Sequence, residues 1–181
     1  MAAMTSRERV QRAINFQQAD RVPMDLGGMK ASGIAVETYH KLRQKLGLAG
    51  TPRVLDTRLM IAQVEEPVLK RFGIDVVPLD TSVISALTSP ESQWVPRRLF
   101  SGTDVLLPPG TRIQEDRNGD WVLLDESGAP SSFRMPKNGY YFDDTSFNRG
   151  EGIDPAKFEP IDDIPDETLR QIEEYSSGLY H

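Results

Sequence analysis

The sequence contains no cysteine and only two histidines, His40 and His181. Without cysteine the chain forms no disulfide, has no thiolate nucleophile and offers no thiolate to a metal ion. A zinc site made from this chain alone would need both histidines together with carboxylates, and nothing in their spacing supports one. We therefore predict no metal site within these residues.

The sequence also lacks a long hydrophobic run and an excess of basic residues. No apolar stretch approaches the roughly 20 residues that span a bilayer. The N-terminal stretch MAAMTSRERVQRAINF lacks the apolar core of a secretory signal. The formal net charge of −6 disfavours a phosphate-backbone partner. We expect a cytoplasmic protein that binds neither membrane nor nucleic acid.

Two segments of the N-terminal half have the composition of short buried strands. They are residues 22–26 (VPMDL) and residues 74–79 (IDVVPL). Helical patterns surround them: a capping box at Thr5–Glu8 opens the first helix, and Gly47 ends a second helix that we expect to begin at Ser32. Strands that alternate with helices indicate a parallel sheet.

A different pattern follows, typical of an antiparallel β-meander. Asn118-Gly119 stands directly before the apolar run 121–124, which is a strong hairpin signal. We also expect a short strand at 140–142. The predicted organisation is residues 1–88, an inserted meander at 89–148, and a linker with a returning helix at 149–181.

Two stretches resemble the N-terminal half of the uroporphyrinogen decarboxylase superfamily. They are SRERVQRAINFQQADRVPMDLGG near the start and EEPVLKRFGIDVVPL at 65–79. The sequence is closer to the methyltransferase-like and uncharacterised branch, which often has the pattern GGxxxSG seen at 27–33 and an inserted segment like that at 119–143. The resemblance implies an α/β fold, a partial (β/α)8 TIM-type barrel interrupted by the meander. Removing the meander leaves room for roughly half of such a barrel, which takes about 250 residues.

The same resemblance argues against porphyrinogen decarboxylation. In the decarboxylase, arginines on the loop after the first strand hold substrate carboxylates, and here Gly28 and Ser32 occupy those positions. A catalytic aspartate is expected shortly after the second strand, where this sequence has Ser82, with Asp80 two residues earlier. The implied activity is therefore methyl transfer involving a corrinoid protein.

Candidate site residues follow from their place after the two expected strands. The catalytic candidates are Asp25, Asp80 and Ser82, and the substrate-binding candidates are Gly27, Gly28, Lys30 and Tyr140.

Each candidate also has a structural alternative. Asp25 could cap nearby backbone amides, and Lys30 could be a solvated loop side chain. Asp80 and Ser82 could cap a turn or a helix. Tyr140 could pack in the core of the meander, and Asp75 could anchor a loop by a hydrogen bond.

Three functions remain open at this point. The first is the N-terminal portion of a methyltransferase-like enzyme that binds a small-molecule substrate and is not competent alone. In that branch, zinc bound by histidine and cysteine of the second half activates a thiol, and a corrinoid protein is the methyl partner. The second is a non-catalytic half barrel that pairs with a complementary half or with itself. The third is uroporphyrinogen decarboxylase, a lyase.

Overall fold

The computed structural model describes residues 3–79, 88–146, 167, 169–171 and 173–174. Helix α1 (Ser6–Ile14) begins at the predicted capping box: the Glu8 amide donates to Thr5 Oγ1 at 3.2 Å and the Thr5 amide donates to Glu8 Oε2 at 2.9 Å. These two bonds satisfy amides that the first turn of a helix otherwise leaves without partners. The prediction of this helix start is confirmed.

Helix α2 (Val36–Lys45) begins later than predicted. Ser32 lies in a short 3-10 helix, η1 (Lys30–Ser32), and Ala35 is the N-cap of α2. The predicted cap at Ser32 is wrong because its hydroxyl is hydrogen-bonded to Asp25, as described below. Gly47 follows the helix with a φ of +70°, as expected of a helix stop.

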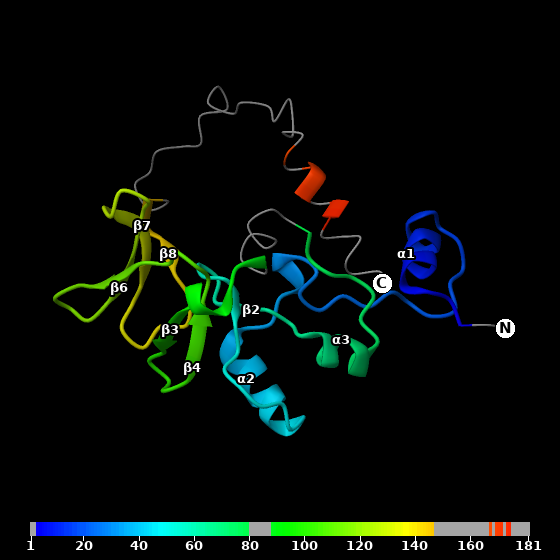
Figure 1. Cartoon of the computed structure of the whole chain (residues 1–181), viewed down its shortest axis with the longest axis horizontal. Coiled ribbons are helices and arrows are strands. Elements are labelled where there is room, and N and C mark those ends of the chain that lie inside the picture. The colour runs from blue at the N-terminus through cyan, green and yellow to red at the C-terminus, as the bar shows by residue number, and fades with distance from the viewer. Residues whose placement is uncertain (1–2, 80–87, 147–166, 168, 172, 175–181) are drawn as a thin grey trace.

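Helix α3 (Glu66–Phe72) has proline in its first turn and ends at Gly73, whose φ is +61°. Proline is tolerated there because the first-turn amides have no partner within the helix. Gly73 turns the chain directly into residues 74–79, which run beside residues 22–26 (Figure 1).

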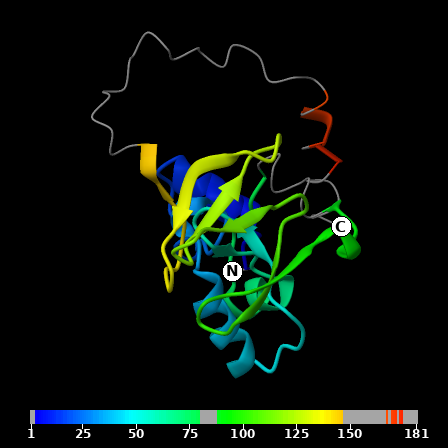
Figure 2. The same cartoon turned by 90° about the vertical axis from the view of Figure 1, so that its left-hand side faces the viewer.

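The strands within the described residues form antiparallel ladders. Strands β1 (Val54–Asp56) and β2 (Ile61–Ala62) form one pair, and β3 (Val95–Arg98) and β4 (Asp104–Leu107) form a hairpin after a 3-10 turn, η2 (Glu91–Gln93). The third sheet is a meander of four strands in sequence order: β5 (Ile113–Glu115), β6 (Trp121–Leu124), β7 (Pro130–Met135) and β8 (Asp143–Asp144). Figure 2 views the molecule from the side of this meander. The hairpin predicted at Asn118-Gly119 is confirmed, whereas the strand expected at 140–142 is displaced to β8.

One hydrophobic core joins α2, α3 and all three sheets. Its most deeply buried side chains are Val36, Tyr39, Val54, Met60, Ala62, Val68, Val105, Leu107 and Met135. Backbone contacts also connect the parts, among them a parallel bridge between Arg53 and Leu106 of β4 and a hydrogen bond from the Phe142 amide to the Arg58 carbonyl at 2.7 Å.

The expected partial (β/α)8 barrel is wrong. Residues 22–26 and 74–79 are extended and adjacent, but they form no strand pair. The Asp75 amide donates to the Met24 carbonyl at 2.8 Å, whereas the Met24 amide donates to the side chain of Asp75 at 2.9 Å rather than to a backbone carbonyl. A carboxylate therefore takes the place of the next bond of a ladder. The fold is mixed and rich in small antiparallel sheets.

None of the helices within the described ranges is both long and apolar enough to cross a membrane.

Candidate functional site

The loop after residues 22–26 is organised by one carboxylate. Asp25 Oδ1 accepts a hydrogen bond from the Gly28 amide at 2.7 Å, and Asp25 Oδ2 accepts one from the Ser32 hydroxyl at 2.7 Å. The Gly27 amide closes the loop by donating to the Ser32 carbonyl at 3.0 Å. Asp25 therefore fixes the shape of residues 27–33, and both of its oxygens are engaged in doing so.

Gly28 and Gly33 have no room for a side chain. A Cβ on Gly28 would lie 2.6 Å from Asp25 Oδ1 and 2.6 Å from Val76 Cγ1. A Cβ on Gly33 would lie 2.5 Å from Ile61 Cγ2. The loop packs its backbone directly against residues 74–79 and β2, which explains the glycines of the GGxxxSG pattern.

Lys30 is held by an ion pair. Its Nζ lies 2.9 Å from Oδ2 of Asp56, whose other oxygen accepts the Leu59 amide at 2.9 Å. Burial raises the pKa of the Asp56 carboxyl, but the hydrogen bonds from Leu59 and Lys30 outweigh it, so the pKa lies below its ordinary value. Lys30 thus ties the loop to β1.

Four of the seven candidate residues lie in or directly before this loop: Asp25, Gly27, Gly28 and Lys30. Tyr140 lies in the connection between β7 and β8, and its side chain is 68% exposed. Asp80 and Ser82 lie outside the described residues.

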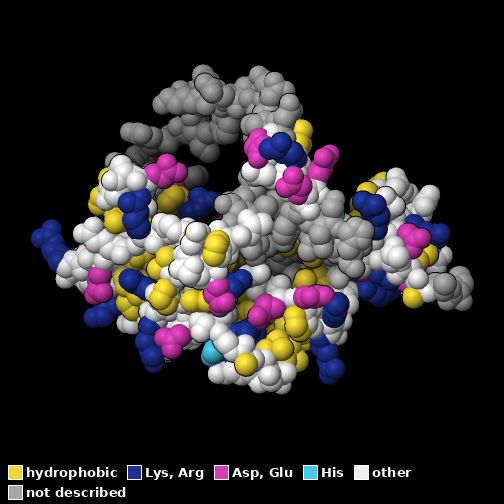
Figure 3. Space-filling model, in the orientation of Figure 1, with side chains coloured by type: hydrophobic (Ala, Val, Ile, Leu, Met, Phe, Trp, Pro, Cys, Tyr) yellow, Lys and Arg dark blue, Asp and Glu magenta, His cyan; other side chains and the backbone are white. Residues whose placement is uncertain are grey.

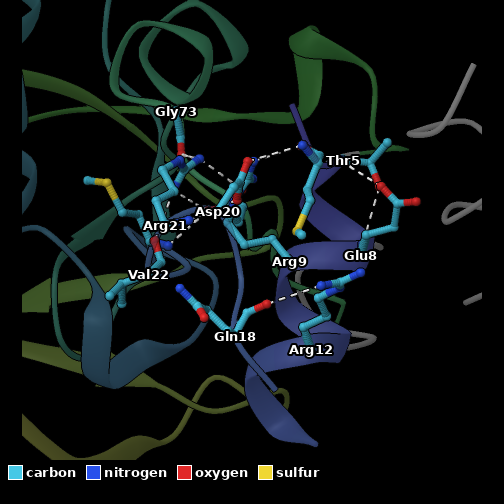
Figure 4. A network of polar contacts seen from close by, with 12 residues as sticks. Thr5, Glu8, Arg9, Arg12, Gln18, Asp20, Arg21, Val22 and Gly73 are labelled. Atoms are coloured by element: carbon cyan, nitrogen blue, oxygen red, sulfur yellow. Dashed lines mark hydrogen bonds and ion pairs between the residues drawn. The ribbon is translucent and has the colours of Figure 1, made fainter. Parts of the chain in front are cut away.

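A second polar cluster is the most extensive within the described ranges, and most of it was not predicted. Asp75, whose side chain is fully buried, accepts hydrogen bonds from Arg9 Nη1 at 2.5 Å and from Arg21 at 2.7 and 3.0 Å. Arg9 also donates two hydrogen bonds to Asp20, from Nε to Oδ1 at 2.7 Å and from Nη2 to Oδ2 at 2.9 Å (Figure 4). We call Arg9, Asp20, Arg21 and Asp75 the arginine–aspartate clamp.

The charges of the clamp stabilise one another. The Arg9 guanidinium holds the pKa of the Asp20 carboxyl well below its usual range, and its bonds to Asp20 and Asp75 raise the pKa of Arg9 itself. Burial raises the pKa of Asp75, but the hydrogen bonds from the Met24 amide and the two arginines outweigh it and lower the pKa overall. Arg9, Asp20 and Asp75 are therefore charged at neutral pH.

A sequence signal for the clamp does exist. Arg9 lies four residues before Ala13, which places a charge beside the apolar side of α1. A cation at such a position needs a partner, and the sequence does not indicate which of its 27 carboxylates that partner is.

A third cluster fixes α2 to the start of α3. The buried Tyr39 hydroxyl donates to Glu65 Oε2 at 3.0 Å and accepts the Glu65 amide at 2.9 Å. Arg43 Nε lies 2.6 Å from the same carboxylate oxygen. Burial raises the pKa of Tyr39 to about 12. We interpret this arrangement as structural, because Tyr39 and Glu65 bond each other and the Arg43 guanidinium also donates to the Gly50 carbonyl at 2.8 Å.

The described residues do not fit a zinc site. Within these ranges no group of three His, Cys, Asp or Glu side chains could hold a metal ion. His40 Nε2 lies 3.0 Å from the side-chain nitrogen of Gln44 rather than beside a carboxylate.

Comparison of the chain with protein-family models, with curated proteins and with solved structures finds no match.

Proposed function

We propose that this chain is the N-terminal portion of a methyltransferase-like enzyme related to the uroporphyrinogen decarboxylase superfamily, and that it is not competent alone. The reaction class is methyl transfer between a small-molecule substrate and a corrinoid protein.

The contact between the two motif-bearing segments supports this proposal most. Arg9, Asp20 and Arg21 belong to the first segment that resembles the family, and Asp75 belongs to the second. These residues meet in the arginine–aspartate clamp, although Arg9 and Asp75 are 66 positions apart. The two segments that carry the resemblance therefore contact one another through buried and partly buried charged side chains.

The loop at residues 27–33 is the substrate-binding element of the proposal. Asp25 shapes it, Gly27 and Gly28 let its backbone pack against Val64 and Val76, and Lys30, whose ammonium is paired with Asp56, is its cationic side chain. Tyr140, Asp80 and Ser82 remain proposed site residues on other segments. The thiol-activating zinc, where used, would be bound by histidine and cysteine from elsewhere, because this chain has no cysteine.

The proposal is tested with methylcobalamin as methyl donor and a panel of small thiols as acceptors. We expect the gene product isolated from its native source to exceed 20.3 kDa, the mass of these 181 residues, and to demethylate methylcobalamin in the presence of one thiol. Asp25→Asn should lower the rate about tenfold by loosening the loop, and Asp104→Asn, on an exposed hairpin, should not. Turnover by the 181-residue chain alone, or no turnover by the native product with any thiol, contradicts the proposal.

A non-catalytic binding module is the second candidate. Exposed apolar side chains at the N-terminal end favour it, since such patches mark interaction surfaces. A native mass of 20.3 kDa together with a stable complex and no methyl transfer would select this candidate.

A further inference from the structure

Residues 3–24 form an arm at one end of the molecule. The arm contains α1 and the extended chain that follows it, and α1 lies at the end opposite to β6 and β7 (Figure 1). Arg9 and Arg21 attach the arm to Asp75 and to the Gly73 carbonyl. Its firmest connection to the rest of the chain is therefore polar.

The apolar side chains of the arm are left exposed. Ile14 is 68% exposed, Phe16 is fully exposed and Val22 is 81% exposed, whereas the buried residue of α1 is Arg9. A helix of nine residues is marginal in water unless an apolar face packs against a partner. We therefore expect another segment to pack on the exposed apolar side chains of the arm.

The charge of the arm favours an acidic segment as its binding partner. An open groove beside α1 is lined by Met4, Glu8, Gln11, Arg12, Ile14, Asn15 and Gln17. The arm carries four arginines and two carboxylates, and Asp75 adds a third carboxylate through the clamp, which leaves an excess charge of +1; Arg12 lines the groove, and the Glu8 carboxylate there is engaged with Thr5. Figure 3 shows apolar and basic side chains next to one another at this end of the molecule. A second arm of the same charge would be repelled.

The chain itself carries such a segment. Residues 1–146 contain 18 Lys and Arg and 18 Asp and Glu, so the whole net charge of −6 comes from residues 147–181. Within that stretch, residues 151–166 hold six carboxylates and one lysine, with Ile153, Phe158, Ile161 and Ile164 spaced among them. These residues lie outside the described ranges.

We propose that residues 151–166 bind the arm of the same chain, with their apolar side chains on Ile14 and Phe16 and their carboxylates beside Arg12. Burial of apolar area supplies the affinity, and the opposite net charges supply the selectivity.

The absence of cysteine makes a direct test possible, since two introduced thiols are the only ones in the full chain. Gln17→Cys at the groove is combined with Pro160→Cys, and the rate of intrachain disulfide closure under mild oxidation is measured on non-reducing gels. The matched control combines Gln114→Cys, an exposed position on β5, with Pro160→Cys. A structureless tether closes the control faster, because the chain that leads to residue 160 leaves the described residues just after β8, which belongs to the same sheet as β5, whereas α1 lies at the opposite end of the molecule (Figure 1).

We expect the arm pair to close about tenfold faster than the control, because docking raises the effective concentration of the two thiols. Adding Arg12→Glu, or Ile14→Ser with Phe16→Ser, should remove that advantage, and these exposed positions are replaced without disturbing the core. Closure of the arm pair at or below the control rate overturns the proposal. Covalent dimers that form faster than intrachain bonds also overturn it, because they show that a second copy covers the arm.

Discussion

Asp75 connects the N-terminal arm to the segment that follows α3. Its side chain is fully buried and joins Arg9, Arg21 and the Met24 amide. Asparagine in its place keeps the size but leaves two guanidinium groups facing a neutral amide.

We expect Asp75→Asn to lower the free energy of unfolding by about 3–5 kcal/mol, the usual cost of removing one partner from a buried ion pair. Urea unfolding monitored by circular dichroism measures it. Asp104→Asn removes an exposed pair with Arg98 at 3.5 Å and should cost less than about 1 kcal/mol. Equal losses in the two variants would show that the clamp contributes no more than a surface pair.

Tyr39 gives a second prediction at the scale of one residue. Its folded-state pKa is raised from about 10 to about 12, so the neutral phenol stabilises the fold. That stabilisation is complete below pH 10 and is lost as the pH rises through 12, because the unfolded chain gives up this proton first.

Spectrophotometric titration of tyrosinate should show one group that ionises near pH 12, and Tyr39→Phe should abolish that step. Tyr140→Phe, at an exposed position, serves as the control and should leave the step in place. A titration in which Tyr39→Phe and Tyr140→Phe behave alike contradicts the assignment.

Among the elements, those with local signals could be predicted and those that depend on distant partners could not. The capping box at Thr5 and the left-handed Gly73 fix helix ends within a few residues of chain. Residues 22–26 have the composition of a strand, but a strand requires a partner, and the side chain of Asp75 occupies one position where a ladder would continue. The glycine loop was located from sequence, whereas the arginine partners of Asp75 required the fold.

Helix α1 should be sensitive to its cap, since little apolar packing holds it. We expect Thr5→Ala to destabilise α1 by about 1 kcal/mol. Amide hydrogen exchange of the residues within Ser6–Ile14 should accelerate, while exchange in α2 stays unchanged. Gln11→Ala, at an exposed position of the same helix, should slow that exchange slightly because alanine favours helix. Faster exchange in α2 as well would mean that the cap acts on the whole fold.

For the molecule as a whole, the lowered carboxyl pKa values predict acid sensitivity. The pKa values of Asp20, Asp75 and Asp116 all lie below the ordinary value of 3.8. Their contribution is complete above that value and is lost as the pH falls through the lower folded-state values.

The urea midpoint should therefore be level near neutral pH and fall steeply below about pH 4. Asp75→Asn should flatten this fall, because one of the groups that must be protonated is gone. A midpoint that changes little on acidification would contradict the ionised state of the clamp.

The clamp also sets an order of events during synthesis. Arg9 and Asp75 are 66 positions apart, so the N-terminal helix leaves the ribosome well before the carboxylate that it needs. Until then Arg9 can contact Asp20, 11 positions away, which gives the nascent arm a provisional partner. Emergence of residues 73–75 converts that local contact into the four-residue clamp, so the arm is docked late although it is made first.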